Sequence, residues 1–183
     1  MTKVFIGGSR RISRLSPEVQ SRLNRIIEKC LPVLIGDANG ADKAVQQYLY
    51  RKGYKLVEVF CAEDICRNNL GGWPVRIVPS NGKRRDFNFY TTKDRVMAEE
   101  ASVGFMIWDG KSVGTLLNVL RLVRQQKTVV VYITSAKKFV NLNKREDWKR
   151  FMNRCTPDIW QRLESKAAAE QQYNRPLHQA NLF

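Results

Sequence analysis

The sequence has little of the chemistry that zinc sites, histidine triads and membrane spans require. It holds one histidine, His178, in a polar C-terminal stretch, so neither a zinc site nor a histidine-based triad is predicted. No apolar run approaches the roughly 18 residues that a transmembrane helix needs. The first residues lead directly into a strand-like run, without the pattern of a signal peptide. We therefore expect a cytoplasmic protein with no metal, no cofactor and no membrane contact.

Cysteine is also scarce, and its spacing is uninformative. Cys30, Cys61, Cys66 and Cys155 include no CxxC pair. Such spacing is typical of free thiols in a reducing cytosol rather than of a disulfide framework or a metal site. We therefore expect all four to be free thiols.

Two common nucleotide-binding motifs are missing. Gly110, Lys111 and Ser112 could end a P-loop, GxxxxGK[ST], but the upstream Gly104 lies one residue too far away. The dinucleotide motif GxGxxG does not occur anywhere. The chain is therefore predicted to be neither an ordinary P-loop NTPase nor an NAD-dependent dehydrogenase.

Positive charge is what the chain has in excess. Its 32 basic and 17 acidic side chains give a formal net charge of +15, and the excess is spread along the sequence. A surface of this kind attracts polyanions, because neutralised phosphates release their counterions. An anionic small molecule and a nucleic acid are both compatible partners, and charge alone does not decide between them.

Strand-like and helix-like segments alternate along the chain, which is typical of parallel βαβ units. Strands are predicted at 3–8, 32–37, 56–62, 103–109 and 128–134, with a short one at 75–78. Helices are predicted from Pro17, which Ser16 would cap, and at 41–52, 84–101, 114–126 and 144–172. The fold class is α/β: a Rossmann-like three-layer fold with a mostly parallel sheet of about five strands. We expect residues 1–134 to form a nucleotide-binding domain. Residues 135–183 would be a C-terminal helical extension packed on that domain or on a partner subunit of a homo-oligomer.

Glycine-rich turns follow three of the predicted strands. Ligands of open parallel sheets bind at the carboxyl ends of strands, where helix N-termini offer free N–H groups to phosphate. We therefore predict ligand contacts from the first turn, Gly7, Gly8, Ser9 and Arg10; the second, Gly36, Asp37, Asn39, Gly40 and Asp42; and the third, Gly110, Lys111, Ser112, Gly114 and Thr115. The alternative is that the glycines only make tight turns.

These turns resemble those of the SLOG superfamily, which includes the lonely-guy phosphoribohydrolases, YpsA-related proteins and the Rossmann domain of DNA-processing protein A. The resemblance covers residues 3–134 and is carried by GGSR at 7–10, GDANGAD at 36–42 and GKSVGT at 110–115. KDRVM at 93–97 is similar to a family helix that brings a basic residue to the site, which adds Arg95 to the ligand contacts. The resemblance implies a phosphorylated nucleotide or an ADP-ribose- or NAD-like ligand. It also implies N-glycosidic bond cleavage in some branches.

Catalysis is left open by one substitution. The phosphoribohydrolase turn reads GGxGTxxE, and Asn118 stands here at the glutamate position. Asparagine cannot serve as a base or a nucleophile, so Asp37 or Asp109 would have to act as the catalytic carboxylate of a nucleotide N-glycosidase or transferase. The alternative role of both aspartates is turn formation and helix capping.

Three functions are therefore compatible with the sequence: a nucleotide sensor, an enzyme that cleaves a glycosidic bond, and a binder of single-stranded nucleic acid. A basic and aromatic stretch could contribute to the last, by holding a phosphate and stacking a base. Its members are Lys83, Arg84, Arg85, Phe87, Phe89 and Tyr90. The alternative for these residues is a helix start whose apolar side chains face the core.

Overall fold

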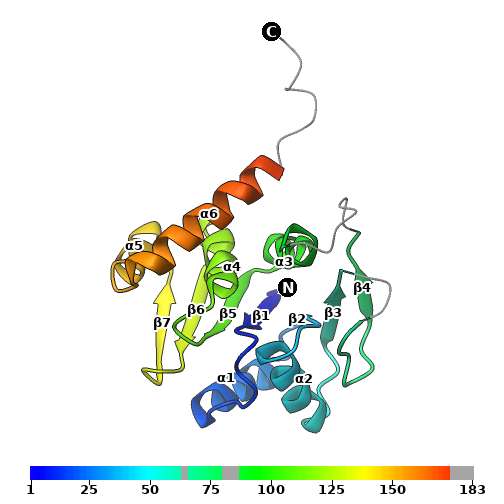
Figure 1. The fold of residues 1–183 in the computed structure, drawn as a ribbon. Helices are drawn as coiled ribbons and strands as arrows, with labels where there is room; N and C mark the ends of the chain where they lie inside the picture. Colours follow the sequence, from blue (N-terminus) through cyan, green and yellow to red (C-terminus); the bar gives the residue numbers. More distant parts are fainter. Residues whose placement is uncertain (63–65, 80–86, 174–183) are drawn as a thin grey trace.

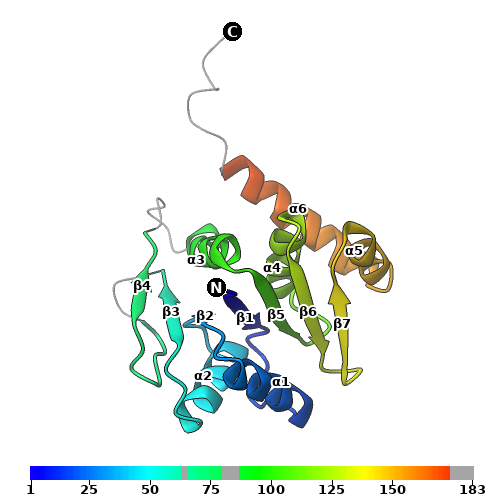
Figure 2. The ribbon, with the colours of Figure 1, turned by 180° about the vertical axis from the view of Figure 1, so that it is seen from behind.

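The computed structural model describes residues 1–62, 66–79 and 87–173, without the side chains of 87–90 and 171–173. In these ranges a mixed sheet lies between two layers of helices (Figures 1 and 2). The predicted α/β, Rossmann-like three-layer fold is confirmed. No described helix is both long and apolar enough to cross a membrane.

The sheet has seven strands in the order β4-β3-β2-β1-β5-β6-β7. They are β1 (Val4–Gly8), β2 (Val33–Gly36), β3 (Val57–Cys61), β4 (Val75–Ile77), β5 (Val103–Trp108), β6 (Thr128–Ile133) and β7 (Lys138–Leu142). The first six in spatial order are parallel, and β7 pairs antiparallel with β6. From β1 the chain steps outward to β4 and then returns to place β5 on the other side of β1. The strand order therefore reverses between β1 and β5, where open sheets form a ligand crevice.

Helices cover both faces of the sheet. The helices α1 (Pro17–Glu28) and α2 (Ala41–Arg51) cover one face (Figure 1). The opposite face carries α3 (Phe87–Glu100), α4 (Val113–Arg124), α5 (Arg145–Met152) and α6 (Pro157–Tyr173) (Figure 2). Ser16 caps α1 as predicted, because its side chain accepts the Val19 N–H.

Strand residues alternate between two cores, which explains why the strands read as continuous apolar runs. In β1, Val4 and Ile6 pack with the α1–α2 layer, whereas Phe5 packs with the layer of α3 to α6. In β5, Ile107 belongs to the first core and Met106 to the second. Burial on both faces fixes the register of the central strands, since a one-residue slip would exchange the two sets.

The C-terminal part differs from the single helix predicted at 144–172. Residues 138–142 form β7, and Pro157 begins a separate helix because proline suits the first helical position but not a helix interior. Phe139 of β7 packs against Tyr132 with ring centroids 4.9 Å apart. The sheet therefore has more than the five strands expected, and position 134 falls inside the β6–β7 hairpin. Trp148, Phe151 and Leu163 complete the core under α4.

Candidate functional site

A cavity of about 760 Å³ opens at the carboxyl ends of β1 and β5, where the strand order reverses. Its walls come from the first turn, the third turn, one face of α3 and one face of α6. The sequence predicted many of these residues: Gly7, Gly8, Ser9, Arg10, Asp42, Asp109, Gly110, Lys111, Ser112, Gly114 and Thr115 all line the cavity. The first and third turns therefore converge, as their places after parallel strands suggested.

Asp109 joins these two turns. One of its oxygens, Oδ2, accepts the Ser9 hydroxyl at 2.7 Å, and Oδ1 accepts the N–H groups of Lys111 at 3.0 Å and Ser112 at 2.7 Å. Burial alone would raise the pKa of Asp109, but the hydrogen bonds outweigh it and lower the pKa. Both oxygens of an ionised carboxylate are thus engaged, which favours the turn-forming alternative over a catalytic role.

The third turn leads into the N-terminus of α4, which faces the cavity. Ser112 caps this helix, because its Oγ accepts the Thr115 N–H at 3.3 Å and the Thr115 hydroxyl at 2.9 Å. A side chain at Gly114 would find no described atom within 4 Å of its Cβ. The first turn of a helix carries N–H groups without intrahelical partners, so the local potential is positive. Gly114 therefore leaves this helix end open to the cavity.

The second turn supports the first turn more than it lines the cavity. Gly40 has φ +87°, and a Cβ there would lie within 2.4 Å of three backbone atoms of Arg10. The neighbouring Ala41 N–H donates to Ser9 O at 3.0 Å. Among the described cavity-lining residues, Ala38 and Asp42 represent this turn. The structure does not bring Gly36, Asp37, Asn39 and Gly40, which were predicted as ligand contacts, to this cavity, because the turn packs beneath the first.

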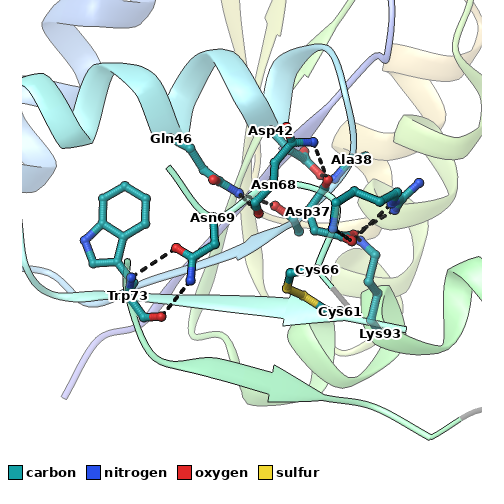
Figure 3. Close-up of a disulfide and its surroundings, with 12 residues drawn as sticks. Asp37, Ala38, Asp42, Gln46, Cys61, Cys66, Asn68, Asn69, Trp73 and Lys93 are labelled. Atoms are coloured by element: carbon teal, nitrogen blue, oxygen red, sulfur yellow. Dashed lines mark hydrogen bonds and ion pairs between the residues drawn. A yellow bond between two sulfur atoms is a disulfide. The ribbon is translucent and has the colours of Figure 1, made fainter. Parts of the chain in front are cut away.

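Asp37 is held away from the cavity by the segment that follows β3 (Figure 3). Its carboxylate pairs with the Arg67 guanidinium at 2.7 Å and 3.1 Å, and Asn68 donates to its backbone oxygen at 2.7 Å. Burial would raise the pKa of Asp37, but Arg67 and then Lys93 outweigh it and lower the pKa. Asp37 was predicted to be catalytic; it is instead a buried anchor for the second turn.

A disulfide between Cys61 and Cys66 fixes the start of this segment (Figure 3). The prediction of four free thiols was therefore wrong for this pair, whereas Cys30 and Cys155 are free. A separation of five residues in the sequence does not by itself predict such a pairing. Asp37, Cys61 and Cys66 place ligand-type atoms within 4.8 Å of one another. The two sulfurs form a disulfide and the Asp37 carboxylate pairs with Arg67, so these atoms are already engaged and the arrangement is structural.

Lys93 is a buried cation in the cavity wall that sequence reasoning did not select. Its Nζ lies 3.1 Å from Asp94 Oδ1 and 3.8 Å from Asp37 Oδ1. The Asp42 carboxylate approaches the same place, since a Cβ at Gly36 would touch both Lys93 Nζ and Asp42 Oδ2.

The carboxylates of Asp37, Asp42 and Asp94 surround the Lys93 ammonium, and their pKa values shift in different directions. Burial would lower the pKa of Lys93, but its acidic neighbours raise it. Burial raises the pKa of Asp42 to about 7, although Lys93 acts in the opposite direction. Lys93 therefore stays charged, and Asp42 is the carboxyl that holds a proton near neutral pH.

Helical periodicity explains why Lys93, rather than the predicted Arg95, lines the cavity. Lys93 precedes the fully buried Met97 by four residues and so shares its face of α3. Arg95 lies two positions further along, about 200° around the axis. It points instead to α6, where its Nε lies 3.2 Å from Glu170 Oε1. The structure therefore does not place Arg95, which was predicted as a ligand contact, in the cavity lining.

Helix α6 forms the far wall of the cavity, with Ile159, Arg162 and Lys166 on one face. The pKa of Lys166 is lowered, first by burial and then by the charges of Arg162 and Arg10. Lys166 therefore lies close enough to Arg162 and Arg10 to be repelled by both, while Arg162 Nη1 lies 3.3 Å from Asp158 Oδ2 on the same wall. The sequence motifs did not predict the contribution of α6, because α6 lies outside residues 3–134, which the SLOG resemblance covers.

Asn118 borders the cavity beside an acidic partner. Its Nδ2 donates to Asp94 Oδ2 at 3.2 Å. Burial would raise the pKa of Asp94, but Lys93 and Arg121 outweigh it and lower the pKa. The position that carries glutamate in phosphoribohydrolases thus faces the cavity with an amide.

Comparison with known proteins identifies the fold. No family model matches the sequence, and no curated protein matches it. The X-ray structure of DNA processing protein A from Streptococcus pneumoniae is similar with a TM-score of 0.55 and 19% sequence identity, over 71% of this chain and 50% of that chain. The chain has the fold of DNA processing protein A. The same protein from Helicobacter pylori, whose single-stranded DNA binding mode has been analysed structurally, is similar with a TM-score of 0.53 and 14% identity. That match spans 92% of this chain and 81% of that one.

Both matches agree with the Rossmann-like fold that the SLOG resemblance implied. The chain spans half the length of the Streptococcus pneumoniae protein. Three predictions lie outside the described residues: the basic cluster Lys83, Arg84 and Arg85, the side chains of Phe87, Phe89 and Tyr90, and the polar stretch with His178.

Proposed function

We propose that the cavity binds single-stranded nucleic acid through its backbone phosphates. The observation that carries the proposal is the position of Arg10, Arg162 and Lys166 on the cavity wall, where burial and then the charges of Arg162 and Arg10 lower the pKa of Lys166. A phosphate placed among them would relieve this repulsion and release counterions. The net charge of +15 favours the same class of partner.

The lining supports backbone contact rather than base recognition. Phe5 is the aromatic residue among the described lining side chains, and it is buried in the core at 1% exposure. Among the described lining residues there is therefore no exposed ring on which a base could stack. The N-terminus of α4 and the side chains of Arg10, Lys111, Arg162 and Lys166 would hold phosphate oxygens. Binding would therefore depend little on base sequence.

The fold similarity supports the same choice between partners. The Helicobacter pylori protein of this fold is one whose binding of single-stranded DNA has been described. A volume of about 760 Å³ is within the range of roughly 300–1,000 Å³ that small-molecule sites occupy. A free mononucleotide is accordingly the competing ligand that the experiment must separate from a strand.

The test compares a fluorescent twelve-residue oligothymidylate with thymidine monophosphate in fluorescence anisotropy titrations. The double variant Arg162→Ala, Lys166→Ala should weaken oligonucleotide binding by about tenfold or more, on the order of 1.4 kcal/mol. Lys55→Ala is the matched control, because this exposed lysine lies outside the described cavity lining. Equal losses in the double variant and in Lys55→Ala would count against a site at the cavity.

A second pair of variants tests whether the cavity itself is used. Gly114→Leu should place its side chain in the open space beside α4 and block the ligand, whereas Gly114→Ala should leave binding intact. Unchanged binding in Gly114→Leu would contradict the proposal. So would competition by thymidine monophosphate at the same molar concentration as the oligonucleotide, which would favour the nucleotide-sensor alternative.

A further inference from the structure

A second cavity, of about 930 Å³, lies in the helical layer away from the strand ends. It is a groove between the end of α4, the start of α5 and α6, which cross one another in Figure 2. Helix α6 contributes Leu163 and Ala167 to this groove, whereas Arg162 and Lys166 face the first cavity. The two cavities therefore use different faces of one helix and share no described lining residue.

The floor of the groove is apolar. It is formed by Leu120, Val123, Trp148, Trp160, Leu163 and Ala167. The Trp160 indole N–H donates to Met152 O at 3.0 Å, and the Trp148 ring packs on Phe151 with centroids 6.1 Å apart. Trp148 is 7% exposed, so most of its ring is covered, and the floor is reached mainly at the less deeply buried Leu120, Val123 and Trp160. These three side chains suit contact with apolar side chains of a partner.

The rim of the groove is basic. Arg124, Lys144, Arg145 and Lys149 are exposed along it, and Glu164 is the acidic residue among the described lining. A fifth cation, Lys127, is occupied, because its Nζ donates to the backbone oxygens of Ala98 and Glu99. The rim therefore favours an anionic partner.

We propose that this groove binds a short segment of another protein, in which apolar side chains alternate with acidic ones. The apolar residues would enter the floor, and the acidic residues would meet the rim. A second copy of this chain fits poorly, since each copy carries a net charge of +15. Residues 174–183 fit poorly as well, because they contain no acidic side chain. The proposal does not depend on nucleic-acid binding at the first cavity.

The test uses three fluorescein-labelled synthetic peptides and the full chain. The first peptide, DELDDFLED, has both features; KKLKKFLKK reverses its charge, and DESDDSSED lacks its apolar side chains. We expect the first to bind with micromolar affinity and the other two to bind at least tenfold more weakly. Ala168→Trp, at an exposed position on the groove, should weaken binding of the first peptide at least tenfold by filling the space.

Charge reversal gives an independent variant. Arg124→Glu with Lys149→Glu should weaken peptide binding at least tenfold, whereas the exposed Lys55→Glu outside the groove should not. Failure of the first peptide to bind at millimolar concentration would overturn the proposal. Equal binding of DESDDSSED would also overturn it, because attraction would then be purely electrostatic. The proposal would also be overturned if Arg124→Glu with Lys149→Glu weakened oligonucleotide binding more than peptide binding, because the groove would then be a nucleic-acid surface.

Discussion

At the scale of single residues, burial decides which predicted side chains are chemically available. Asp37 and Asp109 are the carboxylates that the sequence singled out, and each is fully engaged by donors. Their pKa values are lowered, so neither holds a proton near neutral pH. Asp42 is the contrasting case, because burial raises its pKa to about 7. Asp42, which the sequence predicts as a ligand contact, is therefore the carboxyl of the site that holds a proton near neutral pH.

Asp42 should impose a specific pH dependence on stability. Its pKa is about 7 in the folded chain and about 3.8 as an ordinary aspartate, so between these values the folded state holds a proton that the unfolded state has lost. Stability from this group is therefore lost as the pH rises from about 4 to 7. Asp42→Asn should remove that loss, so wild type should weaken relative to the variant by at least about 1 kcal/mol over the interval.

Urea unfolding of both proteins at several pH values measures this difference. Asp37 and Asp94 act in the opposite direction, since their pKa values are lowered, but both proteins retain them. Only the difference between the two stability curves is therefore informative. A difference that stays flat, or that grows in favour of wild type as the pH rises, would refute the assignment.

At the scale of elements, the sequence predicted the strands and turns well and the outer pieces poorly. Ser16 with Pro17 marked α1 correctly, because capping chemistry is local. Strand β7 was missed because its run KFVNL is short and half polar, and the single helix predicted at 144–172 continued past Pro157, which instead begins α6. Arg95 was preferred to Lys93 by family resemblance, although periodicity with Met97 favours Lys93. Features that depend on neighbouring residues could be predicted from the sequence, whereas contacts between distant segments could not.

The docking of α6 depends on one buried carboxylate. Glu170 is 7% exposed and pairs with Arg121 at 2.9 Å and with Arg95 at 3.2 Å. Glu170→Gln would remove the carboxylate that faces both guanidinium groups and leave Arg121 with the more distant Asp94, at 3.9 Å, so we expect a loss of about 3 kcal/mol in the free energy of unfolding. Glu164→Gln, at an exposed position of the same helix, should change it by less than about 0.5 kcal/mol.

Chemical denaturation of these two variants checks the prediction. A loosened α6 would also displace Arg162 and Lys166, so Glu170→Gln should weaken oligonucleotide binding even under conditions where it remains folded. Equal stability of the two variants would mean that the ion pairs do not hold the helix in place.

At the scale of the whole molecule, the sequence predicted the fold and the charge, but it predicted only part of the cavity lining. The turns after β1 and β5 carry sequence signals because tight turns and helix starts need particular residues. The α6 wall carries none, since Arg162 and Lys166 look like any solvated helix face until the helix is docked. The clamp of Arg67 on Asp37 was equally invisible, because it joins segments 30 residues apart.

The net charge of +15 leads to a prediction about salt. Oligonucleotide affinity should fall linearly on a logarithmic plot against salt concentration, with a slope of about −0.7 for each phosphate that is neutralised. Removing Arg162 and Lys166 should bring the slope closer to zero by about 1.4. Titrations between 50 and 200 mM salt, on the order of physiological ionic strength, measure both slopes. An unchanged slope would mean that these side chains do not neutralise phosphates.

The walls of the strand-end cavity are contributed by opposite ends of the chain, by residues 7–11 and by residues 156–166. During synthesis on the ribosome, the parallel sheet can therefore assemble well before its binding site does. A nascent chain that has exposed β1 to β6 would have the turns but not the α6 wall. The complete cavity therefore forms only after residues 156–166 have been synthesised and have docked on the earlier part of the chain.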